Sequence, residues 1–135
     1  MNLKAVVFDL DGTIVTFNLD YKAARAEVIE FLTREGFPHS VFSINESVFE
    51  TLKKAEIYLQ NHHHTIAKDL SKLKKDVLNI MEKYEIESAK TTQLLPGILE
   101  TLQALKKMKL KLALFTVNSK KSTNHILNTF HLKNT

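Results

Sequence analysis

The 135-residue sequence contains no cysteine and no tryptophan, and it has only three glycines and two prolines. Without cysteine, a disulfide framework and thiolate chemistry are excluded, which suits a reducing cytoplasm. Few glycines and prolines predict short loops. No apolar run approaches the length of a membrane span, and a strand predicted at the N-terminus leaves no room for a signal peptide. We therefore expect a cytoplasmic location and no membrane partner.

Neither sign of charge dominates, since 19 Lys and Arg against 15 Asp and Glu give a net charge of only +4. The basic residues are spread through predicted helices, as at Lys68, Lys72 and Lys75, which is typical of solvated helix faces. We therefore expect no nucleic-acid partner. No acidic residue follows Glu100. The apolar content of 44% is ordinary for a globular chain, and the length predicts one domain by default.

The most informative residues are Asp9-Leu10-Asp11-Gly12-Thr13, which follow the apolar run 5–8. That run predicts a buried β-strand, so the two carboxylates stand where a strand ends and a turn begins. Gly12 permits a tight turn and a close approach of the backbone to an oxyanion. The carboxyl ends of parallel strands are where α/β proteins place their chemistry. A carboxylate pair there can hold a divalent cation, attack an electrophile or pass a proton.

A second apolar strand, 111–115, ends in Thr116 and follows a predicted helix that begins near Pro96 and ends near Met108. Between the two strands the pattern is helical throughout. We expect helices over about 21–35 and 66–89, and between them a helix opened by a capping box, with Ser43 as N-cap and Glu46 at the third helical position. A last helix is predicted over about 121–130.

The string Asp9-Leu10-Asp11-Gly12-Thr13 resembles the DxDGT signature of the haloacid dehalogenase-like (HAD) superfamily, in its phosphatase branch. The strand that ends in Thr116, with the helix before it, resembles the second motif of that family. This resemblance implies an α/β fold: a Rossmannoid core with a parallel sheet, incomplete here, and an inserted helical cap. The core would be residues 1–16 and 93–135, and the cap residues 17–92.

The same resemblance implies the roles of the site residues. Asp9 would be the nucleophile that forms an aspartyl-phosphate, and Asp11 the general acid and base. Asp9 and the backbone carbonyl of Asp11 would hold Mg²⁺, while Gly12, Thr116 and Asn118 would bind the phosphoryl group of a small phosphorylated substrate. Purely structural roles are the alternatives: a turn-capping Asp9, an Asx-turn at Asp11 and an ordinary strand end at Thr116.

The sequence departs from the family pattern after its second motif. The third motif is a Lys or Arg beyond the second strand, and Lys120, Lys121 and Lys133 come too early to serve. The fourth is a later acidic pair. The chain thus resembles the first half to two-thirds of such an enzyme. The alternative is an inactive or partial module, either a fragment or a chain that completes its fold with a partner. Two strands alone would expose edges and apolar faces, which makes self-association or a complementing chain a further expectation.

Two chemical alternatives stay open from the residues. Phosphomutase or phosphonate chemistry is possible within the same family. The run His62-His63-His64 suggests a metal site, but adjacent side chains do not converge on one ion in a helix or strand, so a solvated break between helices is the preferred interpretation.

Overall fold

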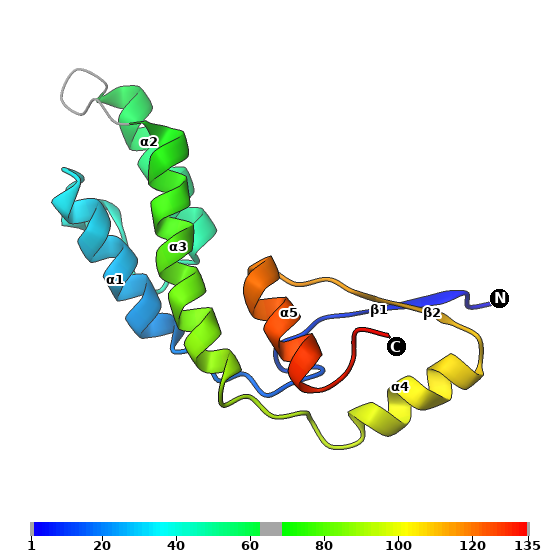
Figure 1. Ribbon diagram of the computed structural model, residues 1–135. Helices are drawn as coiled ribbons and strands as arrows, with labels where there is room; N and C mark the ends of the chain where they lie inside the picture. The colour runs from blue at the N-terminus through cyan, green and yellow to red at the C-terminus, as the bar shows by residue number, and fades with distance from the viewer. Residues whose placement is uncertain (1, 63–68, 135) are drawn as a thin grey trace. The chain divides into compact units, whose positions relative to one another are not determined.

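The computed structural model describes residues 2–62 and 69–134 and shows a mixed α/β chain (Figure 1). This confirms the predicted fold class. The elements in order are β1 (Ala5–Phe8), α1 (Tyr21–Arg34), a 3₁₀ turn η1 (His39–Val41), α2 (Val48–Asn61), α3 (Leu70–Ala89), α4 (Ile98–Lys107), β2 (Lys111–Leu114) and α5 (Lys120–Thr129). Across the described residues, no helix combines the length and apolarity needed to cross a membrane.

The chain divides into two compact units. The strand unit consists of the residues up to Leu19 and those from Glu85 onward, and the helical unit is Asp20–Tyr84. One boundary therefore falls within α3. The limits predicted for core and cap, 16/17 and 92/93, lie inside the strand unit, and the assignment of the intervening helices as a cap stays a prediction.

The strand unit is built on β1 and β2, which pair in parallel with Ala5 opposite Lys111 and Phe8 opposite Leu114. A parallel pair needs a long crossover between its strands, which the intervening chain supplies. The pairing extends one step further, because the N–H of Phe115 donates to the carbonyl of Phe8 over 2.8 Å. Both strands consequently end at the same edge of the sheet.

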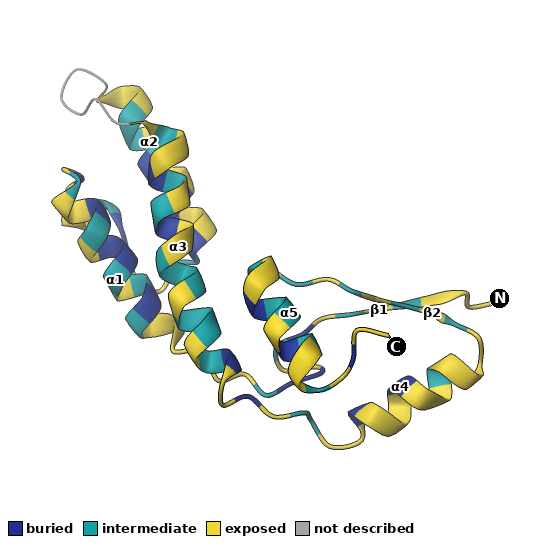
Figure 2. Ribbon diagram, viewed as in Figure 1, coloured by how far each residue is buried: buried dark blue, intermediate teal, exposed yellow. Residues whose placement is uncertain are grey.

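The two faces of this sheet differ in burial (Figure 2). Side chains alternate between the faces of a strand. Phe8, Leu112 and Leu114 pack on one face against a buried cluster that consists of Leu10, Ile14, Val15, Ala89, Ile98, Leu102, Ile126 and Leu132. On the alternate positions, Val7 is 65% exposed and, beyond β2, Phe115 is 74% exposed. The expected uncovered apolar face is therefore present among the described residues.

A short ladder joins the segment after β1 to the segment before α4. The N–H of Thr16 donates to the carbonyl of Gln93 at 2.8 Å, and the N–H of Leu95 donates to the carbonyl of Ile14 at 2.9 Å. The buried Thr92 hydroxyl donates to the carbonyl of Thr16 over 3.0 Å. These bonds satisfy polar groups of the backbone and of Thr92. They join the segments that precede and follow the helical unit in the sequence.

The helical unit has its own core, formed by α1, α2, α3 and the segment between α1 and α2. Its buried side chains recur at helical spacing, as predicted from the apolar periodicity. They are Val28, Ile29, Leu32, Phe37, Phe42, Val48, Leu52, Ala55, Leu73 and Val77. The Phe37 ring lies 5.9 Å from that of Phe42 and 5.6 Å from that of Tyr58, centroid to centroid, in tilted aromatic contacts.

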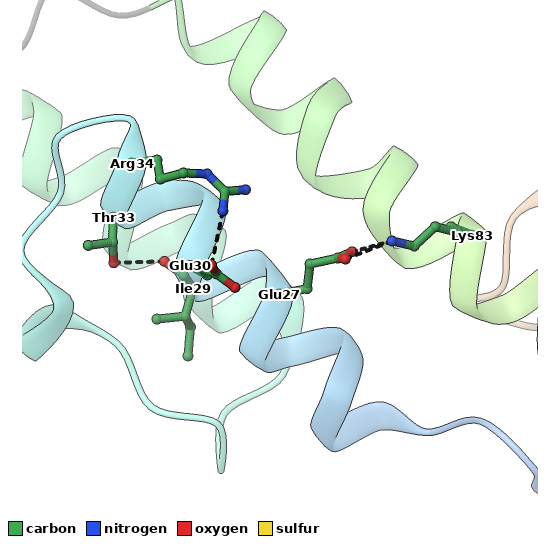
Figure 3. Close-up of polar contacts among 6 residues, drawn as sticks. All are labelled: Glu27, Ile29, Glu30, Thr33, Arg34 and Lys83. Atoms are coloured by element: carbon green, nitrogen blue, oxygen red, sulfur yellow. Dashed lines mark hydrogen bonds and ion pairs between the residues drawn. The ribbon is translucent and has the colours of Figure 1, made fainter.

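An ion pair joins α1 to α3 at the surface of this unit (Figure 3). The ammonium of Lys83 lies 2.7 Å from both carboxylate oxygens of Glu27. This hydrogen bond raises the pKa of Lys83, and the charge of Glu27 adds to the effect. Within α1, Arg34 pairs with Glu30 one turn away, and the Thr33 hydroxyl donates to the carbonyl of Ile29. These exposed contacts orient side chains more than they stabilise the fold.

Two details of the predicted helix ends are wrong. The capping box is formed by Ser47 and Glu50, one turn later than predicted, and α2 starts at Val48; Ser43 instead closes a turn with Asn45 and Glu46. Pro96 lies before α4 rather than in its first turn. Gly97 is the N-cap with a left-handed φ of 79°, so helical geometry starts only at Ile98.

Burial in the helical unit predicts how its stability responds to truncation. Leu32 is fully buried, so Leu32→Ala should lower the free energy of unfolding by about 2–5 kcal/mol through lost contacts and a cavity. Leu78 on α3 is 45% exposed, so the matched Leu78→Ala should cost less than about 1 kcal/mol. Urea denaturation of both variants tests this. Equal losses would contradict the described packing.

Candidate active site

The loop after β1 is held by backbone hydrogen bonds to the carbonyl of Leu10. That oxygen accepts from the N–H groups of Thr13, Ile14 and Val15 at 3.3, 2.9 and 3.1 Å. The Leu10 side chain is fully buried, so it anchors the loop in the core. Of its neighbours, Asp9 is exposed and Asp11 is half-buried. The buried Leu10 thus lies between two carboxylates that are at least partly accessible to solvent.

Gly12 adopts a φ of 75°, in the left-handed region that other residues rarely occupy. Its N–H donates to the carbonyl of Val15 at 2.7 Å, which closes the turn. A Cβ at this position would meet no atom within 4 Å. The requirement for glycine is therefore conformational rather than steric, and a close approach of an oxyanion to Gly12 stays a prediction.

The loop after β2 contains Thr116, Asn118 and Ser119. The backbone N–H of Asn118 donates to the hydroxyl oxygen of Thr116 over 3.2 Å. Ser119 is the N-cap of α5, and its hydroxyl accepts from the N–H of Ser122 at 3.1 Å. Ser119 rather than Asn118 therefore caps α5, which leaves the side chain of Asn118 for another contact.

That contact joins the two loops. The side-chain Nδ2 of Asn118 donates to Oδ2 of Asp11 over 2.9 Å, although the residues are 107 positions apart. The structure thus brings together Asp11, Asn118 and, through the Asn118 backbone, Thr116. The carboxylate of Asp9, on the same loop as Asp11, accepts from the N–H of Leu10 at 2.8 Å.

The environment of Asp11 changes its acidity. Burial is the main cause that raises the pKa of this carboxyl above its ordinary value of 3.8. The hydrogen bond from Asn118 works in the opposite direction, and the nearby charge of Asp9 raises the pKa further. A carboxyl group whose proton is held more tightly than usual is suited to proton transfer.

One contact in this region has no signal in the sequence. The carboxylate of Glu85, from α3, accepts from the backbone N–H of Ser119 at 2.8 Å. An acceptor at the N-terminus of a helix satisfies an otherwise unpaired donor and complements the helix dipole. Because Glu85 and Ser119 lie 34 positions apart, only the tertiary fold brings this carboxylate to the loop.

The donors available to a metal ion are few. No cluster of three or more His, Asp or Glu side chains suited to a metal exists within residues 2–62 and 69–134. The carboxylate of Asp9 and the backbone carbonyl of Asp11 are hard oxygen donors of the kind that Mg²⁺ binds together with substrate phosphates. Of the three consecutive histidines, His62 is exposed, stacks on Tyr58 at 4.0 Å and ends α2, while His63 and His64 lie outside the described residues.

Comparison with known protein families decides the relationship. A family model described as haloacid dehalogenase-like hydrolase matches residues 3–134. The chain belongs to this HAD-like hydrolase family. The resemblance carried by the two motifs is therefore confirmed. None of the curated proteins compared with the chain matches it.

Solved structures show the same fold. A predicted phosphoglycolate phosphatase from Haemophilus somnus 129PT is 22% identical, with a TM-score of 0.51 over 96% of this chain. A predicted phosphatase from Clostridium acetobutylicum is 18% identical, with a TM-score of 0.50 over 96% of this chain. The chain spans only 58% and 56% of those two proteins.

The raised pKa of Asp11 predicts how stability depends on pH in this HAD-like chain. The folded state holds the Asp11 proton more tightly than the unfolded state does, so this contribution is full below pH 3.8 and is lost as pH rises through the raised pKa. Asp11→Asn should therefore be more stable than wild type at pH 7, by at most about 1 kcal/mol because the half-buried carboxylate is partly screened by water. The difference should shrink toward pH 3.

Thermal unfolding in metal-free buffer at pH 3 and pH 7 measures this difference. Asp20→Asn is the matched control, because Asp20 is the exposed N-cap of α1 and asparagine caps helices equally well. A loss of stability in Asp11→Asn at pH 7 would contradict the described environment of Asp11.

Proposed function

We propose that this chain is the catalytic part of a Mg²⁺-dependent phosphomonoester hydrolase that acts on a small phosphorylated molecule through an aspartyl-phosphate. The observation that carries the proposal is the contact between the two motifs, Asn118 Nδ2 to Asp11 Oδ2 at 2.9 Å. It places the residues of the first motif beside those of the second at one edge of the sheet. Membership of the hydrolase family supports the reaction class.

In the proposed first step, a carboxylate oxygen of Asp9 attacks the phosphorus atom of the substrate. The bond from phosphorus to the leaving oxygen breaks, and that oxygen takes a proton from the carboxyl group of Asp11. Asp9 is exposed at the end of β1, so its carboxylate is accessible to a substrate. Forming an acyl phosphate divides one difficult displacement into two easier steps.

In the second step, water attacks the aspartyl-phosphate and gives its proton to the Asp11 carboxylate, which regenerates both aspartates and releases inorganic phosphate. The same residue thus acts as acid and then as base. Burial favours the protonated form of Asp11 before the first step, because it raises the pKa of this group. The Asp9 carboxylate also raises this pKa while it is charged.

The phosphoryl group needs donors that offset its charge. We propose that the hydroxyl of Thr116 and the side chain of Asn118 supply them, while Gly12, whose N–H is bound to the carbonyl of Val15, lets the backbone approach the phosphoryl group closely. The Thr116 oxygen accepts a hydrogen bond from the Asn118 N–H, so its own proton is directed elsewhere and can be donated. Mg²⁺, held by Asp9 and the Asp11 carbonyl, would supply charge neutralisation between the carboxylates and the phosphate.

The nucleophile is tested by Asp9→Asn. With Mg²⁺ and an aryl phosphate, the wild-type chain should release the aryl alcohol, and Asp9→Asn should lower kcat by on the order of 10³-fold or more, because an amide does not form the acyl phosphate. Asp20→Asn should retain wild-type activity. Turnover at the wild-type rate in Asp9→Asn would overturn the assignment of the nucleophile, and an inactive wild-type chain would overturn the proposed activity.

The phosphate donor is tested by Thr116→Val, which keeps the shape of the side chain and removes the hydroxyl. We expect weaker binding of inorganic phosphate as a competitive inhibitor, by about 10- to 150-fold for one lost hydrogen bond to a charged group. Thr129→Val in the last turn of α5 is the control, since its exposed hydroxyl donates to the carbonyl of His125 instead. An unchanged inhibition constant in Thr116→Val would remove Thr116 from the site.

A further inference from the structure

We propose that Asn118 is a positioning residue that holds the Asp11 carboxylate in one orientation toward the substrate. This inference rests on the proposed function, and it gives Asn118 a role through Asp11 in addition to any contact with phosphate. An amide has two N–H groups, and the contact with Oδ2 of Asp11 uses one of them.

The chemistry of the ionised state fixes which atom of Asn118 makes the contact. While Asp11 is ionised, its carboxylate only accepts hydrogen bonds, so Nδ2 of Asn118 faces it rather than the amide oxygen. The distance of 2.9 Å is that of a normal charge-assisted bond. Because the donor is neutral, it orients the carboxylate without adding a full positive charge to the site.

The ionised form of Asp11 is disfavoured at this position for two reasons. Burial removes water from the carboxylate, and the negative charge of Asp9 on the same loop repels it. A rotation of the Asp11 side chain toward solvent would relieve both. The hydrogen bond from Asn118 opposes this rotation. The half-buried carboxylate of Asp11 is therefore held in place by a donor from the loop after β2.

Asn118 is itself fixed on both sides. Its backbone N–H is bound to the Thr116 hydroxyl at 3.2 Å, and the next residue, Ser119, caps α5 and donates its own N–H to Glu85. The amide thus projects from a loop that is tied to β2, to α5 and to α3. A donor on a constrained loop restricts the orientation of the carboxylate, whereas a donor on a mobile loop would move together with the carboxylate.

The decisive measurement is the side-chain rotamer of Asp11. Three-bond couplings about χ1 of Asp11, measured by NMR in the wild-type chain, should report a single rotamer. In Asn118→Ala they should move toward rotamer averages. Asn128→Ala, the same change at an exposed position in α5, should leave them unchanged. An unaltered single rotamer in Asn118→Ala, with the backbone spectrum otherwise preserved, would overturn the proposal.

Kinetics provide a second readout that a purely structural role would not reproduce. Asn118→Ala should lower kcat by about 10- to 100-fold, part of the contribution of a general acid and base, and a rise in KM from the lost contact with phosphate should accompany this loss without replacing it. In the background of Asp11→Asn the same change should have little further effect on kcat, since the group it positions is gone. A rise in KM at constant kcat would overturn positioning in favour of substrate binding. If the wild-type chain shows no turnover, the proposed function fails, and the couplings still decide the role of Asn118.

Discussion

The arrangement of the candidate active site depends on the parallel pairing of β1 with β2. The register sets Phe8 opposite Leu114, so the loops that follow both strands start at the same edge. The contact between Asp11 and Asn118 is possible only because of that register. A slip of one residue would turn the alternating side chains to the opposite face and would separate the two loops. The helical residues between the strands contribute length and a separate core, but the geometry of the site comes from four residues in each of two strands.

The site combines an anchored scaffold with unfavourable electrostatics. Leu10 is fully buried and its carbonyl binds three backbone N–H groups, so the loop cannot relax easily. That rigidity keeps Asp11 half-buried and on one short loop with Asp9, a position that raises its pKa. Catalytic sites commonly contain electrostatically unfavourable groups, which the stability of the rest of the protein offsets. The hydrogen bond from the neutral Asn118 side chain lowers the pKa of Asp11, but burial and the charge of Asp9 still keep that pKa above its ordinary value. Asp11 therefore stays able to hold or release a proton.

The sequence predicted what local patterns determine. Apolar periodicity placed α1, α2 and α5 to within a few residues, and the turn at Gly12 followed from its position after a strand. Prediction from the sequence failed where two local signals compete for the same helix end. Ser43-Glu46 and Ser47-Glu50 have the same capping spacing, and only packing of Val48 into the core selects the second. Contacts across the fold were out of reach, since nothing local marks Asn118 as the partner of Asp11 or Glu85 as the partner of Ser119.

The uncovered face of the sheet bears on whether the site can form in this chain. Val7 and Phe115 are mostly exposed, and the chain spans just over half the length of the solved relatives. Neither side chain belongs to the buried cluster, which lies on the opposite face and already contains Leu10, Ile98 and Ile126. The contacts that build the site, from Asp11 to Asn118 and from Asn118 to Thr116, depend on that cluster and on the strand register. Covering the exposed face would therefore add stability and solubility, while the contact between the two motifs is made by residues of the strand unit alone.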